Sequence, residues 1–366
     1  MPETVPARRV VGYALNVFPY ETLDELWTCL EGDVLKIKDR AFPSEVFPIE
    51  LRLSERLAIE LQQDCERVAR LKHYLDTHDL ALVTVNGFVM PHFHGARVKE
   101  GVYQPAWHES GARARFTKGC LDLVAQLAPQ DIEFASVSVP FGALKPVTMD
   151  AVAPNILSCA EHAAELHQRT GMRCVVALEP EPGLCVETTA EAVEFFEQFV
   201  PEPMRRYLGV NFDLSHQLVE FENLAESIVS LQRHGVPIAK IHVSNAAEMT
   251  ELRPFRGDSI YLHQVCGIDA QGNRAYFSLD WPARPPPPGI ARFRVHYHLP
   301  VHPTETSSTL SEVEEFLTRT PPLHPSIPFI IETYTWPEQL RGRDQLVDNI
   351  CHELAWVRER ISLSRP

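Results

Sequence analysis

Four polar residues lie at or near the ends of apolar runs of the sequence, and their types are those of metal ligands. Glu179 follows Cys-Val-Val-Ala-Leu, and Asp213 follows Leu-Gly-Val-Asn-Phe. His242 lies in Ala-Lys-Ile-His-Val-Ser, and Glu332 follows Phe-Ile-Ile. Three carboxylates and one imidazole form a ligand set that suits Mn²⁺, Mg²⁺, Co²⁺ or Zn²⁺. Because burying three carboxylates without a cation is costly, the pattern predicts one divalent metal ion.

A simpler interpretation exists for each of these acids. A carboxylate after a strand can cap the helix that follows, and Glu332 before Thr333 or Asp213 before Ser215 could do so. Four such residues on four consecutive strands favour the metal site.

The elements that must position these residues alternate between short apolar strands and amphipathic helices, which is typical of a parallel sheet with outer helices. The expected strands are 10–17, 48–53, 81–88, 132–139, 174–178, 208–212, 239–243 and 329–331. The expected helices are 23–37, 54–75, 113–127, 150–169, 189–199, 222–234, 308–319 and 343–361, with Ser54 as an N-cap. Eight such pairs predict an α/β fold, a closed (β/α)8 TIM barrel whose strand ends carry the site.

The alternation breaks once, between the seventh and eighth strands. Extra strands are expected at 260–267, 274–279 and 292–299, around a turn at 269–273. A run of four prolines, 285–288, favours an extended excursion. We therefore expect one barrel domain spanning 1–366 with a β-rich insertion at about 245–305.

A polar loop of about twenty residues follows the third strand, and loops of that length are usually functional. It combines cationic and aromatic side chains: Asn86, His92, His94, Arg97, Lys99, Tyr103 and Trp107. We expect His94, Arg97 and Trp107 to face a polyhydroxylated or phosphorylated small molecule; the alternative is an ordinary exposed loop. Arg52, which ends the second strand, is predicted either to contact substrate or to form an ion pair in the barrel rim.

The order of the strand-end residues, Glu179, Asp213 with His216 three residues on, His242 and Glu332, resembles the xylose isomerase-like superfamily of metal-dependent TIM barrels. That superfamily includes ketose 3-epimerases and sugar phosphate isomerases. Seven stretches also look like the EboE family, which is called a metabolite traffic protein from its operon context. They are Gly12-Tyr13 with Asn16-Val17, Leu51-Arg52-Leu53-Ser54, Asn86-Gly87-Phe88, Phe93-His94-Gly95 with Arg97-Val98-Lys99-Glu100, Leu178-Glu179-Pro180-Glu181-Pro182-Gly183, Tyr261-Leu262-His263-Gln264-Val265 and Glu332-Thr333-Tyr334-Thr335-Trp336.

The superfamily resemblance implies a mechanism. Glu179 and Glu332 would hold the metal and act as the base and acid on opposite faces of a substrate carbon, with Asp213 and His242 as pure ligands. The metal would stabilise an enediolate as a proton leaves the carbon next to a carbonyl. His216 matches a position that hydrogen-bonds a substrate oxygen; the alternative is a supporting or helix-capping histidine.

The chain departs from the epimerase pattern after the seventh strand, because no arginine appears before Arg253. The substrate therefore stays open among sugars, cyclitols and related polyhydroxylated carbonyl compounds. Within the insertion, His263, His296 and His298 are candidates to project inwards. His296 and His298 share one face if this segment is extended, and such a pair can bind metal or lie on a solvated face.

Two other functions compete with a sugar isomerase or epimerase. One is an endonuclease IV-like zinc phosphodiesterase with a trinuclear site, although the fourth strand ends in Ser138 and Pro140 without a histidine. The other is a metabolite-binding or traffic protein without turnover, which the intact pair Glu179 and Glu332 argues against.

Composition and net charge limit the classes of binding partner that we expect. The 366 residues are 45% hydrophobic and 23% charged, which fits a globular protein, and their net charge of −15 disfavours nucleic acids and anionic membranes. Eight cysteines without a C-x-x-C pair predict reduced core thiols. With no signal peptide or membrane span in view, we expect a cytoplasmic protein with a small-molecule substrate. The sequence leaves the oligomeric state open, a homodimer included.

Overall fold

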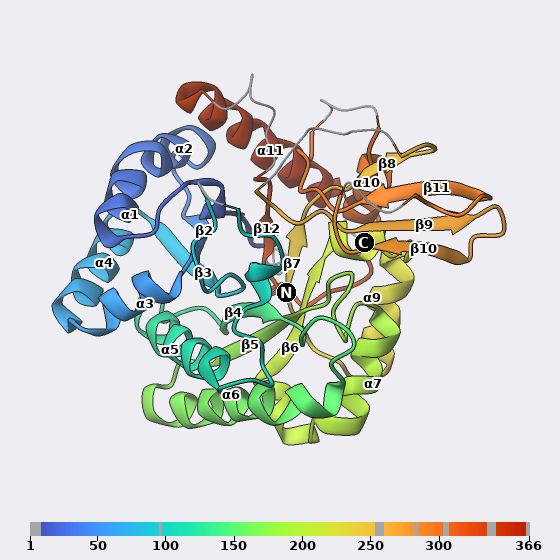
Figure 1. The fold of residues 1–366 in the computed structure, drawn as a ribbon. Coiled ribbons are helices and arrows are strands. Elements are labelled where there is room, and N and C mark those ends of the chain that lie inside the picture. The colour runs from blue at the N-terminus through green and yellow to red at the C-terminus, as the bar shows by residue number, and fades with distance from the viewer. Residues whose placement is uncertain are drawn as a thin grey trace, which may run out of the picture.

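Eight parallel strands close into a barrel surrounded by helices (Figure 1). The computed structural model of the chain describes residues 9–94, 97–252, 260–281, 285–302, 307–334 and 342–363. Neighbouring barrel strands follow the order β1-β12-β7-β6-β5-β4-β3-β2. Their bounds are β1 Val11–Ala14, β2 Phe47–Arg52, β3 Leu80–Asn86, β4 Ala135–Pro140, β5 Cys174–Glu179, β6 Leu208–Asp213, β7 Ile238–Val243 and β12 Phe329–Ile331. The predicted TIM barrel is confirmed.

The helices pack their apolar faces against the outside of this barrel. They are α1 Leu23–Cys29, α2 Leu35–Ala41, α3 Glu55–Gln62, α4 Cys65–Thr77, α5 Ala112–Leu127, α6 Met149–Thr170, α7 Thr189–Phe199, α8 Leu214–Val219, α9 Leu224–Arg233, α10 Leu310–Thr318 and α11 Arg343–Leu363. A π-helical turn, Leu30–Val34, joins α1 to α2, and 3-10 turns cover Leu15–Val17, Lys99–Tyr103 and Glu202–Arg206.

Several expected elements differ in the structure. The strands expected at 260–267 and 292–299 lie at Val265–Asp269 and Ile290–Val295, and the helix expected at 23–37 is interrupted by a π-helical turn. The first strand ends at Ala14, because Leu15–Val17 turns into a 3-10 helix that brings Asn16 over the barrel mouth. The expected helix 54–75 is two helices. Ser54 caps α3 as predicted, accepting a hydrogen bond from Leu57 N, but Asp64 then caps a new helix, α4, through Glu66 N.

The insertion forms a four-stranded antiparallel sheet in the order β10-β9-β11-β8, orange in Figure 1. Its strands are β8 Ala247–Met249, β9 Val265–Asp269, β10 Arg274–Ser278 and β11 Ile290–Val295. The predicted turn joins β9 to β10, with Gly272 at a φ of 86°. The four prolines of 285–288 are exposed. The sheet is tied to α8, since Ser215 Oγ donates to Tyr297 O and Arg294 donates to Leu218 O.

The eight cysteines all lie in described segments, and none forms a disulfide. Six are buried, as expected of core thiols; Cys65 is exposed and Cys351 is half-buried, which corrects the prediction for these two. Within the described residues, no helix has both the length and the apolar character needed to cross a membrane. Gly95, Arg253, Thr335 and Trp336, named above from the sequence, fall outside the described residues.

Candidate metal centre and active site

The four predicted metal ligands come together at the carboxyl ends of four adjacent strands. Glu179 ends β5, Asp213 ends β6, His242 lies near the end of β7, and Glu332 follows β12 directly. One ligand atom from each lies within 4.8 Å of the others, and all four side chains are buried. Parallel pairing places Asp213 opposite His242, which explains how strand register builds the cluster.

His242 Nδ1 is the centre of this cluster. It lies 3.1 Å from Glu179 Oε1, 3.0 Å from Glu332 Oε2 and 3.5 Å from Asp213 Oδ2. Burial alone lowers the pKa of His242, but the surrounding carboxylates, with Glu332 the strongest, outweigh it and hold that pKa well above its ordinary value. The carboxylates thus favour a cation at this point, and a proton on His242 competes with a metal for it.

The opposite ring nitrogen of His242 is fixed by a pair of residues that sequence reasoning missed. Nε2 lies 3.2 Å from both carboxylate oxygens of Glu50, on β2. Glu50 also bonds the buried Lys240, whose ammonium donates to Ser138 Oγ at 2.9 Å. A signal was available, because Lys240 precedes His242 by two residues and therefore shares its strand face.

Asp213 performs the capping role that the sequence left open. Its Oδ1 caps α8 by accepting from His216 N at 3.0 Å, and it also accepts from Ser244 Oγ at 2.7 Å. Its Oδ2 is buried and accepts no hydrogen bond from any described residue. A buried carboxylate oxygen without a donor is costly, so this orphaned atom fits a metal ligand.

Glu332 is held by two asparagines across the barrel mouth. Its Oε1 accepts from Asn16 Nδ2 at 2.6 Å and from Asn86 Nδ2 at 3.2 Å, which leaves Oε2 facing His242. Burial raises the pKa of Glu332, but His242 and His298 outweigh burial and hold the pKa well below its usual value. Its carboxylate therefore stays ionised.

A pocket of about 60 Å³ opens above the cluster. Glu179 and Glu332 line it, whereas Asp213 and His242 are not among its lining residues and are 0% exposed. Its other polar lining residues are Asn16, Arg52, Asn86, Glu181, His216, His296 and His298. Aromatic side chains, among them Phe88, Phe93, Tyr261 and Tyr334, form the rest of the wall.

Arg52 forms the ion pair that one of its two interpretations predicted, and its contact with substrate stays a prediction. Its Nη2 forms an ion pair with Glu21 Oε1 at 2.8 Å, and the side chain also lines the pocket. Nε and Nη1 are buried and donate to no described residue. These two donors are therefore available to a ligand.

The three predicted residues of the third-strand loop lie elsewhere. His94 is held by Tyr261 OH, 2.7 Å from Nδ1, and by Asn16 O, 2.6 Å from Nε2. Arg97 is exposed, and Trp107 is buried in the core with its indole donating to Pro140 O. None of the three is among the described residues that line the pocket, so their contact with substrate stays a prediction.

The histidines predicted around the mouth divide into two groups. His216, His296 and His298 line the pocket and form a second cluster of candidate metal ligands. His263 instead stacks on Tyr297 at 3.9 Å, and its Nδ1 lies 2.8 Å from His296 O. It therefore supports the backbone of His296 from outside the described pocket wall.

Comparison with solved structures bears on the fold. A xylose isomerase-like TIM barrel protein from Mycobacterium smegmatis in complex with magnesium matches with a TM-score of 0.54 and 13% identity, over 96% of this chain and 98% of that chain. The fold is that of a xylose isomerase-like TIM barrel. IolI with a bound zinc atom matches this xylose isomerase-like barrel with a TM-score of 0.52 and 13% identity, over 96% and 99% of the two chains.

A third similar structure is the 3-keto-D-glucoside 4-epimerase YcjR from E. coli, with a TM-score of 0.50 and 14% identity over 96% of this chain and all (100%) of that one. At such identities the likeness to these three proteins is one of fold alone. No protein-family model matches the chain, and no curated protein does.

Proposed function

We propose that this protein is a divalent-metal-dependent isomerase or epimerase that moves a proton next to a carbonyl group of a sugar, cyclitol or related polyhydroxylated metabolite. The observation that carries the proposal is the division among the four buried ligands. Glu179 and Glu332 line the pocket, whereas Asp213 and His242 are not among its lining residues. Two carboxylates of the cluster thus face the pocket in which a substrate carbon would lie.

Glu179, Asp213, His242 and Glu332 would hold the cation. Their chemistry suits it, because three carboxylates surround one imidazole and Asp213 Oδ2 has no donor among the described residues. When bound, the metal would polarise a substrate oxygen as a Lewis acid. Fold neighbours that hold zinc or magnesium support a divalent ion.

The proton transfers belong to the two lining glutamates. One carboxylate takes the proton from the substrate carbon, and the other returns a proton to the same or the neighbouring carbon. Asn16 and Asn86 both donate to Glu332 Oε1 and thereby fix its orientation. Nε and Nη1 of Arg52, which donate to none of the described residues, would orient substrate oxygens.

We further propose that the chain belongs to the EboE family, which it resembles in sequence, and that it is cytoplasmic. A carrier without turnover would bind the same class of metabolite, so binding alone does not separate the two functions. Exchange of a carbon-bound proton with solvent does, since it requires the glutamates to act.

The test measures metal content first and the exchange of a carbon-bound proton last. Elemental analysis should find a divalent ion in the purified chain that Asp213→Ala loses and Asp76→Ala, a change at an exposed surface acid, keeps. Sugars, cyclitols and their phosphates are then screened by metal-dependent thermal shift, because a ligand that binds only the folded state raises its stability. Hits are incubated in deuterated water. Binding of such a ligand without any deuterium incorporation would refute the proposed reaction.

A further inference from the structure

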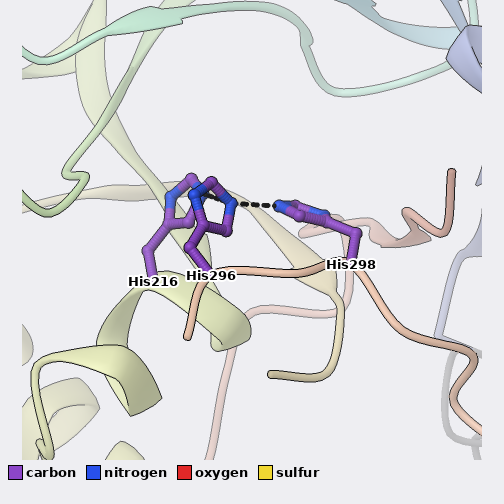
Figure 2. Close-up of side chains that lie close together, drawn as sticks. All are labelled: His216, His296 and His298. Atoms are coloured by element: carbon purple, nitrogen blue, oxygen red, sulfur yellow. Dashed lines mark hydrogen bonds between the residues drawn. The ribbon is translucent and has the colours of Figure 1, made fainter. Parts of the chain in front are cut away.

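Three histidines, His216, His296 and His298, lie close together in the structure (Figure 2). His216 lies on α8, and His296 and His298 lie just beyond β11. The three residues are at most 5% exposed. His296 Nε2 is 3.1 Å from His216 Nε2 and 2.8 Å from His298 Nε2, so the same ring nitrogen of each residue points to one place.

The opposite nitrogens of His216 and His298 are fixed as hydrogen-bond donors. His216 Nδ1 lies 3.0 Å from Pro180 O, and His298 Nδ1 lies 3.2 Å from Glu332 O. A backbone carbonyl can only accept a hydrogen bond, so Nδ1 carries the proton in both rings. In the neutral imidazole, Nε2 is then a lone-pair acceptor.

His296 reaches the same state through Gln264. Its Nδ1 lies 2.6 Å from Gln264 Oε1. The amide orientation is set by its other end, because Gln264 Nε2 donates to Glu181 Oε1 at 2.8 Å and to Pro182 O at 3.2 Å. The amide oxygen carries no hydrogen, so it could not donate to either of these two acceptors. Oε1 must therefore face His296, and His296 Nδ1 is the donor.

Burial lowers the pKa of His298, but Asp213 and Glu332 outweigh burial and raise that pKa to about 9. Without a metal, the proton on His298 Nε2 can join only two of the three buried nitrogens, and a bound metal must displace it. Zinc binds imidazole nitrogen at about 2.0–2.1 Å, which places tetrahedral ligand nitrogens roughly 3.3 Å apart, close to the observed spacings. A ring nitrogen that donates to a carbonyl or amide oxygen on its far side is also the usual setting of a metal-binding histidine. We propose that His216, His296 and His298 bind a second divalent cation of the zinc class through Nε2, with an open coordination position toward the pocket.

The ligand type sets the metal and its role. Three imidazoles favour Zn²⁺ or Co²⁺ over Mg²⁺, which prefers oxygen. A divalent ion among three neutral imidazoles keeps its full charge of +2, whereas one among the three carboxylates of the first cluster leaves a net −1. The second cation is therefore the one that attracts an anionic substrate group, a phosphate or a carboxylate.

The two sites are neighbours with separate ligand sets. Glu332 Oε2 lies 3.2 Å from His298 Nδ1, and Glu179 and Glu332 of the first cluster line the same pocket as the three histidines. Two of the three histidines come from the insertion, which gives this antiparallel sheet a function: it completes the second site. The inference stands on the histidine geometry and does not depend on the proposed reaction.

The experiment counts ions in the full chain. Protein stripped with a chelator is reloaded with Zn²⁺ or Co²⁺, dialysed, and measured by elemental analysis and by the visible absorption of bound Co²⁺. Wild type should hold two ions per chain, and the double variant His296→Ala/His298→Ala should hold one. Asp213→Asn, which retains an oxygen for the α8 cap, should also hold one, and His73→Ala, at an exposed position of α4, should keep two.

The outcomes separate the two proposals. A double variant that binds as many ions as wild type overturns the second site, as does a wild type with one ion that Asp213→Asn loses. If Asp213→Asn keeps every ion while the histidine variant loses one, the second site stands and the proposed function fails. Should the double variant not fold, His216→Gln, on a different element, must lose the same single ion.

Discussion

His242 and Glu50 face each other across the barrel, with Nε2 of the imidazole 3.2 Å from both carboxylate oxygens. Since the carboxylate accepts the Nε2 proton, the other nitrogen, Nδ1, is presented to the three acidic ligands. The ion pair of Glu50 with Lys240, buried on both sides, keeps that carboxylate charged. Burial raises the pKa of Glu50, yet Lys240 and His242 outweigh it and lower the pKa.

Glu50→Gln should damage both stability and metal binding. It leaves the buried ammonium of Lys240 without its counter-charge, a change that costs about 3–5 kcal/mol of unfolding free energy. Loss of the carboxylate behind a ligating histidine weakens metal binding about 10–100-fold. Urea unfolding of the metal-free chain and metal titration measure the two effects.

The double variant Glu50→Gln/Lys240→Met separates these effects. It removes the unpaired charge, so stability should return toward wild type while metal affinity stays low. Glu66→Gln, at an exposed position of α4, should change neither quantity. Full metal affinity in the double variant would remove Glu50 from the positioning of His242.

Glu179→Gln and Glu332→Gln should each abolish deuterium incorporation at a substrate carbon, because an amide cannot take or return the proton. Both changes keep the size of the side chain, so circular dichroism should show an intact fold. Mass spectrometry of a ligand found by the thermal-shift screen reads the exchange. Rapid exchange in either variant would exclude that glutamate as an acid or base.

Arg52→Lys should weaken ligand binding without changing the metal content. Lysine keeps the charge but cannot supply the two free guanidinium donors, and a hydrogen bond to a charged group is worth about 1.5–3 kcal/mol. That range corresponds to a loss of affinity of about 10-fold or more. Arg70→Lys, at an exposed position of α4, is the matched control, and equal affinities in both variants would place Arg52 in a purely structural role.

Glu353, on α11, should make the stability of the fold depend on pH. Its Oε1 accepts from Val301 N and Thr333 Oγ1, both at 2.8 Å, and its Oε2 accepts from Tyr13 OH at 2.7 Å. Burial raises the pKa of Glu353 to about 7. The unfolded value is about 4.3, so the folded state holds the proton more tightly between these two values.

Linkage gives the sign of the effect. The contribution of Glu353 is fully present below about pH 4, falls as the pH rises toward 7, and levels off above that pH, for a loss on the order of 3 kcal/mol. Glu353→Gln has no proton to lose, so its stability relative to wild type should rise by that amount between pH 4 and pH 8. Parallel stability curves for the two proteins in urea would contradict the raised pKa.

The sequence by itself determined the barrel and the four-ligand cluster. Short apolar strands alternate with helices, and the carboxyl ends of parallel strands meet at one face of a closed barrel. Polar residues at or near the ends of four consecutive strands, such as Asp213 and His242, must therefore converge. The register that sets Asp213 opposite His242 was not predicted, because it includes a shift between Val210 and Asn211.

Only the tertiary structure decided which side chains support and complete the site. Glu50 and Lys240 are 190 residues apart, and they meet because β2 and β7 face each other across the barrel interior. Composition drew attention to the loop after β3, but packing turned Trp107 into the core and left Arg97 exposed. His216 and His296 are 80 residues apart, and their contact depends on how the inserted sheet folds back over α8, a long-range placement that no local pattern encodes.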